Sequence, residues 1–180
     1  MDHVAILRRA SIKKGDNLLN DILEGTKTIE SRWYVNKVAP WSRIETGDTL
    51  YFKESGCPVT AKATVSKVLQ YENLTTATTE KIIEKYGQKI APNTTKEEFL
   101  DWAKTQSKKR YCILVFLKDA EKIEPFEIDK TGYGISSAWL VTENISKLKK
   151  YVKKKEIDPD HHKGNQSLSP IYEKPQLNSR

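Results

Sequence analysis

The octapeptide Gly25–Arg32, with the sequence GTKTIESR, stands where a predicted helix passes into a predicted strand. Apolar residues before it recur at helical spacing: Leu18, Leu19, Ile22 and Leu23. Asp16 or Asn17 can cap the start of this helix, and Gly25 can adopt the left-handed conformation that ends one. We therefore expect a helix that closes at Gly25, followed by an extended segment from Thr26 to Trp33.

Short apolar runs bounded by turn residues predict a set of strands on either side of this segment. The predicted strands cover residues 4–7, 49–53, 59–69, 111–117, 125–128 and 137–141. Apolar and polar residues alternate along 59–69, which predicts one buried and one solvent-facing side. The run 111–117 is continuously apolar and is therefore expected to be a central strand.

Two further helices are predicted, over residues 75–86 and 94–104, with Gly87 and Pro92 separating them. The order of elements does not give the regular alternation of strand and helix that builds a doubly wound parallel sheet. The sequence therefore predicts an α+β fold, in which a mixed or barrel-like sheet carries inserted helices.

Length and composition predict one domain with a basic surface. The chain has 180 residues, of which 37% are hydrophobic and 31% charged, and its net charge is +7. Such a charge attracts anionic partners, nucleic acids among them. Cys57 and Cys112 have no metal-ligand spacing, so no metal or cofactor is expected. No signal peptide and no membrane-spanning apolar stretch are apparent, which predicts a cytoplasmic protein without a membrane partner.

The last part of the chain is predicted to differ from the rest. Residues 1–157 are assigned to the domain, and the segment 158–180, which is poor in apolar residues and contains three prolines, is predicted to be a flexible polar tail. The lysine-rich stretch 149–155 is interpreted as a solvated helix face, with phosphate binding as the alternative. His161 and His162 lie in the tail, which offers no preorganised geometry for a metal.

The octapeptide matches the pattern G-x-K-x-x-E-x-R, through Gly25, Lys27, Glu30 and Arg32. In this pattern and in the strands that follow it, the chain resembles the ASCH family of the PUA-like superfamily, over roughly residues 3–150. The resemblance implies a half-open β-barrel of mixed strands with peripheral and inserted helices. It also implies a nucleic-acid-binding role, because the superfamily contains RNA-binding modules together with a few hydrolytic relatives.

If the octapeptide is extended, Glu30 and Arg32 share one face, while Lys27 needs the bend after Gly25 to reach the mouth of a cleft. Glu30 can then hold the Arg32 guanidinium flat for stacking on a base or for contact with a phosphate, and Lys27 supplies a second charge. The plain alternative is a surface ion pair, worth about 0 to 1 kcal/mol.

An enzymatic reading uses the same residues. Lys27 and Glu30 would be an acid–base pair in a ribonuclease or in an amidohydrolase of modified nucleosides, since a partly buried lysine can have a lowered pKa. A hydrolytic subgroup of the resembled family carries a threonine three residues after the lysine. Glu30 stands at that position here, which argues against its amide-hydrolysing chemistry.

Aromatic residues provide stacking surfaces for bases. The candidates are Trp33, Tyr34, Trp41, Tyr133 and Trp139, with core packing as the favoured interpretation of Trp139. Tyr133 lies between two glycines on a predicted loop and can close over a ligand, and Ser136 and Ser137 can add hydrogen bonds. The predicted binding residues are Lys27, Glu30, Ser31, Arg32, Trp33, Tyr133 and Ser136, with RNA expected as the partner in preference to DNA.

Overall fold

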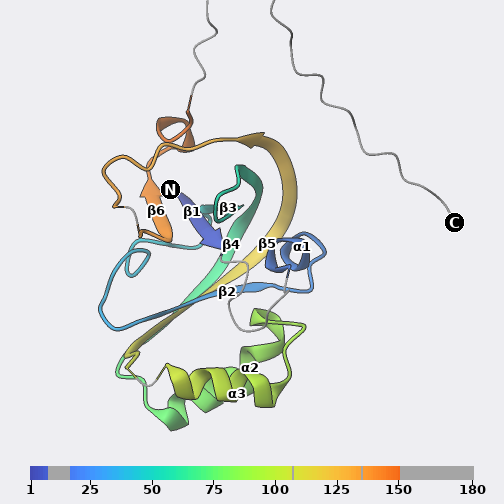
Figure 1. Cartoon of the computed structure of the whole chain (residues 1–180), viewed down its shortest axis with the longest axis vertical. Coiled ribbons are helices and arrows are strands. Elements are labelled where there is room, and N and C mark those ends of the chain that lie inside the picture. The colour runs from blue at the N-terminus through green and yellow to red at the C-terminus, as the bar shows by residue number, and fades with distance from the viewer. Residues whose placement is uncertain (8–16, 107, 135, 151–180) are drawn as a thin grey trace, which may run out of the picture. The chain divides into compact units, whose positions relative to one another are not determined.

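The computed structural model describes residues 1–7, 17–106, 108–134 and 136–150 (Figure 1). The predicted tail 158–180, with its two histidines, and the lysines at 153–155 lie outside the described residues. The strands are β1 (Asp2–Leu7), β2 (Ile29–Tyr34), β3 (Thr49–Glu54), β4 (Val59–Tyr71), β5 (Tyr111–Phe126) and β6 (Trp139–Thr142). The helices are α1 (Leu18–Leu23), α2 (Thr76–Ile90), α3 (Lys96–Thr105) and the 3-10 turn η1 (Ile145–Lys147).

The strands form one sheet in the order β2-β5-β4-β3-β1-β6. β1 and β3 are parallel, and the other neighbouring pairs are antiparallel. The pairing of β4 with β5 shifts register at three places, and irregularities of this kind bend a sheet. Figure 1 shows β4 and β5 curving around β1 and β3. The predicted α+β half-open barrel is therefore confirmed, and β2 and β6 are the two edges of its open side.

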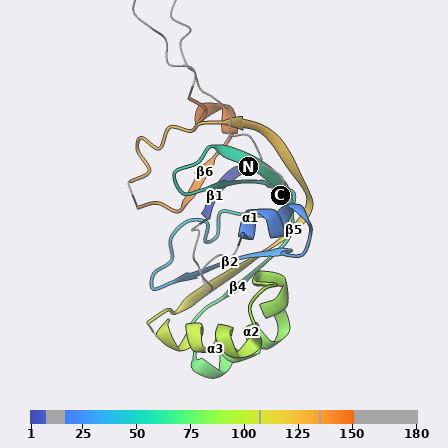
Figure 2. The same ribbon diagram turned by 45° about the vertical axis from the view of Figure 1, so that its right-hand side comes forward.

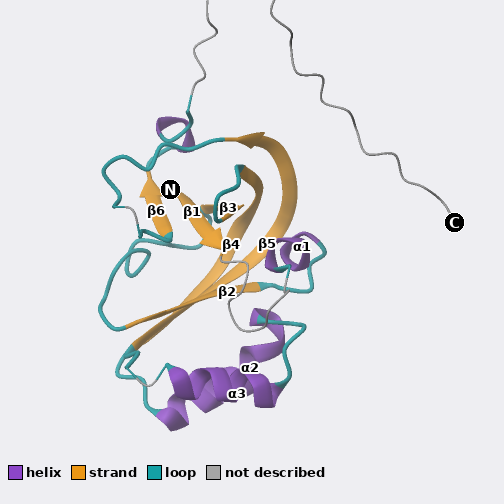
Figure 3. Ribbon diagram, viewed as in Figure 1, coloured by secondary structure: helices purple, strands orange, loops and turns teal. Residues whose placement is uncertain are grey.

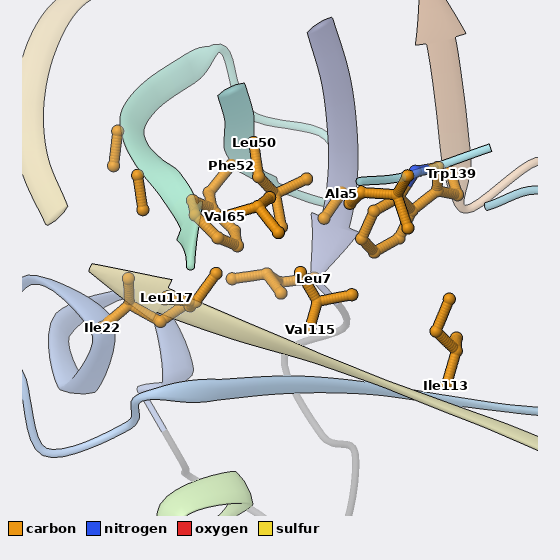
Figure 4. Close-up of a cluster of buried hydrophobic side chains, with 13 residues drawn as sticks. Ala5, Leu7, Ile22, Leu50, Phe52, Val65, Ile113, Val115, Leu117 and Trp139 are labelled. Carbon is orange, nitrogen blue, oxygen red and sulfur yellow. The ribbon is translucent and has the colours of Figure 1, made fainter. Parts of the chain in front are cut away.

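The concave side of the sheet holds the main core (Figure 4). The alternating apolar residues of β4 face inward, with Ala61 and Val65 fully buried against Phe52 of β3 and Val115 of β5. Trp139 of β6 belongs to this cluster, which confirms the core interpretation of that residue. Burial of these apolar side chains stabilises the sheet through the hydrophobic effect.

Helices α2 and α3 cover the outer face at the end of the sheet where β2 lies (Figure 3). Ile29 of β2 packs with Ile83 of α2 and Phe99 of α3 in a second core cluster. Thr95 caps α3, and Glu98 completes the capping box. The view in Figure 2 shows α1 on the opposite side of β2 from α2 and α3.

Two predicted boundaries were wrong. Gly87 does not separate the helices: it lies within α2, where it is buried beside the Phe99 ring of α3. Strand β5 continues to Phe126 and takes in the predicted strand around Pro125, because β4 remains beside it to Val59. Tertiary pairing thus overrides the local signals of a glycine and a proline. None of the helices in the described ranges is long and apolar enough to span a membrane.

Candidate nucleic-acid interface

Three side chains of the octapeptide form a chain of ion pairs. The Lys27 Nζ lies 3.2 Å from one carboxylate oxygen of Glu30, and the Arg32 Nη2 lies 3.0 Å from the other. The Lys27, Glu30 and Arg32 side chains are only 3%, 6% and 14% exposed, respectively. Glu30 therefore pairs with two cations at once in a largely dry environment, which is unlike the ordinary surface pair.

Lys27 is fully engaged inside the protein. Its Nζ also donates hydrogen bonds to the carbonyl oxygens of Ile29, at 2.8 Å, and of Ile90, at 2.7 Å. It thereby ties the start of β2 to the end of α2. Burial lowers the pKa of Lys27 below its ordinary value, and the charge of Glu30 opposes this shift. Lys27 does not reach a cleft mouth as expected, because it precedes β2 and turns inward before the strand alternation begins.

Arg32 spans the open side of the barrel. From β2, its Nη2 donates to the carbonyl oxygen of Ile6 at the end of β1, at 3.3 Å. Its guanidinium carbon lies 5.2 Å from the centroid of the Trp139 ring in β6, within the range of a cation–π contact. The Nε is buried and has no hydrogen-bond partner among the described residues. Arg32 thus contacts both sides of the seam between the two sheet edges.

Trp139 is in turn held from behind by a buried polar chain. Its indole Nε1 donates to Nδ1 of His3 at 3.2 Å, and Nε2 of His3 lies 3.1 Å from the Asp48 carboxylate. An acceptor at Nδ1 requires the proton of neutral His3 to be on Nε2, where Asp48 can accept it. Burial lowers the pKa of His3, with Asp48 opposing the shift, so the neutral form is favoured.

A cleft of about 630 Å³ opens along this seam. We call it the seam cleft, and its lining comes from β2, the segment after β2, the end of α3 and the loop that leads into β6. The lining residues are Ser31, Arg32, Trp33, Tyr34, Val38, Ala39, Trp102, Gln106, Lys109, Tyr133, Ser136, Ser137, Ala138 and Trp139. Within this set Arg32 and Lys109 carry positive charge and no residue carries negative charge, so an anionic ligand is favoured.

Most of the predicted binding residues meet at the seam cleft. Ser31, Arg32, Trp33, Tyr133 and Ser136 line it, whereas Lys27 and Glu30 lie behind it and hold Arg32 in place. Tyr133 is more constrained than a loop residue between glycines suggested, because its hydroxyl donates to the Val141 carbonyl oxygen at 2.8 Å. Trp41 is not in the lining and packs edge-on against Tyr111.

The contribution of the end of α3 and of the segment after it was not predicted from the sequence. Trp102, Gln106 and Lys109 line the cleft although they lie more than sixty residues from the octapeptide in the sequence. The only signal was the basic run Lys108-Lys109-Arg110 between a predicted helix and a predicted strand. This run has no periodicity from which the direction of its side chains could be predicted. No cluster of three or more potential metal ligands occurs within the described parts of the chain.

Solved structures of an ASCH protein resemble this architecture. The crystal structure of the ASCH protein from Zymomonas mobilis superimposes with a TM-score of 0.54 at 13% sequence identity, covering 83% of this chain and 96% of that one. A tyrosine-to-phenylalanine variant of the same protein gives a TM-score of 0.55, also at 13% identity, with 83% and 99% covered. The chain has the ASCH fold. No protein-family model and no curated protein matches the sequence, so the ASCH likeness is established at the level of fold.

Proposed function

We propose that this ASCH-fold chain is a cytoplasmic module that binds single-stranded RNA or a modified nucleotide in the seam cleft. The observation that carries the proposal is the placement of Arg32, whose guanidinium stands at the cleft over an indole and is held by a buried carboxylate. A planar cation fixed in this way is suited to stack on a base or to donate to a phosphate without first losing its freedom.

The rest of the lining supports the same ligand class. Trp33, Tyr34 and Tyr133 offer ring faces and edges, and the hydroxyls of Ser31, Ser136 and Ser137 offer hydrogen bonds. A cleft of this volume falls in the range of small-ligand sites, about 300 to 1,000 Å³. Bases splayed out of a single strand fit such a site, whereas stacked bases in a duplex do not expose their faces.

Fluorescence anisotropy with labelled single-stranded RNA tests the proposal at low salt. Arg32→Ala should weaken binding by about 10- to 100-fold, since a hydrogen bond to a charged group contributes about 1.5 to 3 kcal/mol. Arg43→Ala is the matched control, because it removes the same charge from an exposed position outside the cleft. Absence of RNA binding by the wild type, or equal binding by both variants, would rule the proposal out.

Hydrolysis is the second candidate, and one observation favours it. The pKa of Lys27 is lowered by burial, as a lysine base requires, with Glu30 beside it. Against this role, three acceptors already engage the Lys27 Nζ, and neither residue lines the seam cleft. Incubation with RNA and with acylated nucleosides, followed by product analysis, distinguishes the two: turnover that Lys27→Ala abolishes, in a variant that still binds RNA, would favour the enzyme.

A further inference from the structure

A second cavity adjoins the seam cleft. It has a volume of about 230 Å³ and lies between the start of α2, the second half of α3 and Trp33 of β2. We call it the helix pocket. Leu74, Leu100 and Ala103 give it apolar walls, and Trp33 and Trp102 add two indoles that meet edge to face with centroids 5.8 Å apart.

The helix pocket and the seam cleft share a wall. Trp33, Trp102, Gln106 and Lys109 line both cavities. A ligand that fills the cleft therefore lies against the same side chains as a ligand in the helix pocket. Lys109 is half-buried at this boundary, where the backbone of a strand that passes from one cavity to the other would place its phosphate.

The size and chemistry of the helix pocket limit what it can hold. Its volume is below the range of about 300 to 1,000 Å³ that is typical of sites for whole small ligands, so a single ring system is a better match. Indole and aliphatic walls favour a flat, weakly polar group. Thr76, Thr79 and Gln106 add hydrogen-bonding groups for the edge of such a ring.

We propose that the helix pocket is a second subsite, which receives the base of the nucleotide adjacent to the one in the seam cleft. This inference rests on the proposed function and deepens it: the ligand is an RNA strand of at least two nucleotides, read as two neighbouring bases, with the linking phosphate at Lys109. A mononucleotide fills only the cleft and leaves the helix pocket unused.

Two labelled RNA hexanucleotides test the subsite. One has a base at every position, and the other has an abasic residue at every second position, so that the phosphates are equal in number but no two bases are adjacent. The wild type should bind the complete strand about 5- to 150-fold more tightly, the equivalent of about 1 to 3 kcal/mol for one stacked base. Thr79→Trp, which fills the helix pocket, should abolish this preference while retaining affinity for the abasic strand.

Ala77→Trp is the matched control on the same helix, at an exposed position that does not line the pocket, and it should keep the preference. Thr76→Trp, at an exposed position on the rim, replaces Thr79→Trp if that variant does not fold, as judged by circular dichroism. Equal binding of the two strands by the wild type, or an unchanged preference in a folded pocket-filled variant, overturns the subsite. Failure of the wild type to bind either strand overturns the proposed function itself.

Discussion

Arg32 and Trp139 lie far apart in the sequence, yet the guanidinium carbon of Arg32 lies 5.2 Å from the centroid of the Trp139 ring. A side chain of β2 and a side chain of β6 thus meet across the open side of the barrel. Because Glu30 fixes the other side of the guanidinium, its plane is set before any ligand arrives.

Arg32→Lys should keep the positive charge but lose the planar guanidinium and its contacts. A lysine ammonium cannot make the same flat contact with the Trp139 ring, and it lacks the second guanidinium nitrogen that Arg32 keeps free of Glu30 and Ile6. We expect RNA affinity to fall by about 10-fold or more. Because the net charge is the same, the long-range electrostatic attraction of RNA should hardly change. Titration calorimetry of wild type and variant measures this, and equal affinities would show that a positive charge alone is sufficient.

Lys27→Met should destabilise the fold. It leaves two carbonyl oxygens and one side of Glu30 without a donor in a buried site, and removing one member of a buried ion pair costs about 3 to 5 kcal/mol. Urea unfolding gives the free energy of unfolding. Lys37→Met is the control, because the side chains of the Lys37–Glu72 pair are 44% and 50% exposed. The midpoint of urea unfolding of this variant should be close to that of the wild type. Similar midpoints for the two variants would contradict the structural role of Lys27.

Lys109→Ala should change the salt dependence of RNA binding. If Lys109 contacts the phosphate between the cleft and the helix pocket, the slope of log K against log salt concentration should become shallower by about 0.7, the value for one phosphate of a single strand. Lys118→Ala, at an exposed position away from both cavities, should leave the slope unchanged. An unchanged slope in Lys109→Ala would contradict the contact between Lys109 and a phosphate.

His3 should make the stability depend on pH. Its pKa is lowered in the fold by burial, so the unfolded chain takes up a proton at a higher pH than the folded one. The stability contributed by neutral His3 is complete above the unfolded-state pKa of about 6.5 and declines as the pH falls from there through the folded pKa. Thermal unfolding between pH 7.5 and pH 5 should show this decline in the wild type and a flatter profile in His3→Gln; parallel profiles would exclude His3 as the source.

The octapeptide was predictable because its signals are local. The signals for a capped helix, for a glycine with positive φ at Gly25 and for an extended segment all lie close together in the sequence. The structure contains each of them, with strand β2 beginning at Ile29. The position of Lys27 was not predictable in the same way. Its burial depends on the Ile90 carbonyl oxygen, which belongs to a helix 63 residues further along the chain.

The lining of the seam cleft was also only partly predictable from local sequence signals. Trp139 was expected in the core, and it is there, but one side of its ring also faces the seam cleft because β6 is an edge strand. Periodicity distinguishes the inside of a sheet from its outside and does not mark an open edge. Trp102 and Lys109 were missed because their approach to β2 depends on how α3 packs on the sheet.

The pairing of β6 with β1 has a consequence for folding during synthesis. Strand β6, which supplies Trp139, pairs with β1 at the other end of the described chain, so this wall requires a contact between residues 2–5 and residues 139–142. During synthesis the earlier strands emerge first, and long-range pairings form late. A nascent chain that has not yet extended past Thr142 therefore holds Arg32 without its indole partner, and the seam cleft is complete only after β6 has been synthesised.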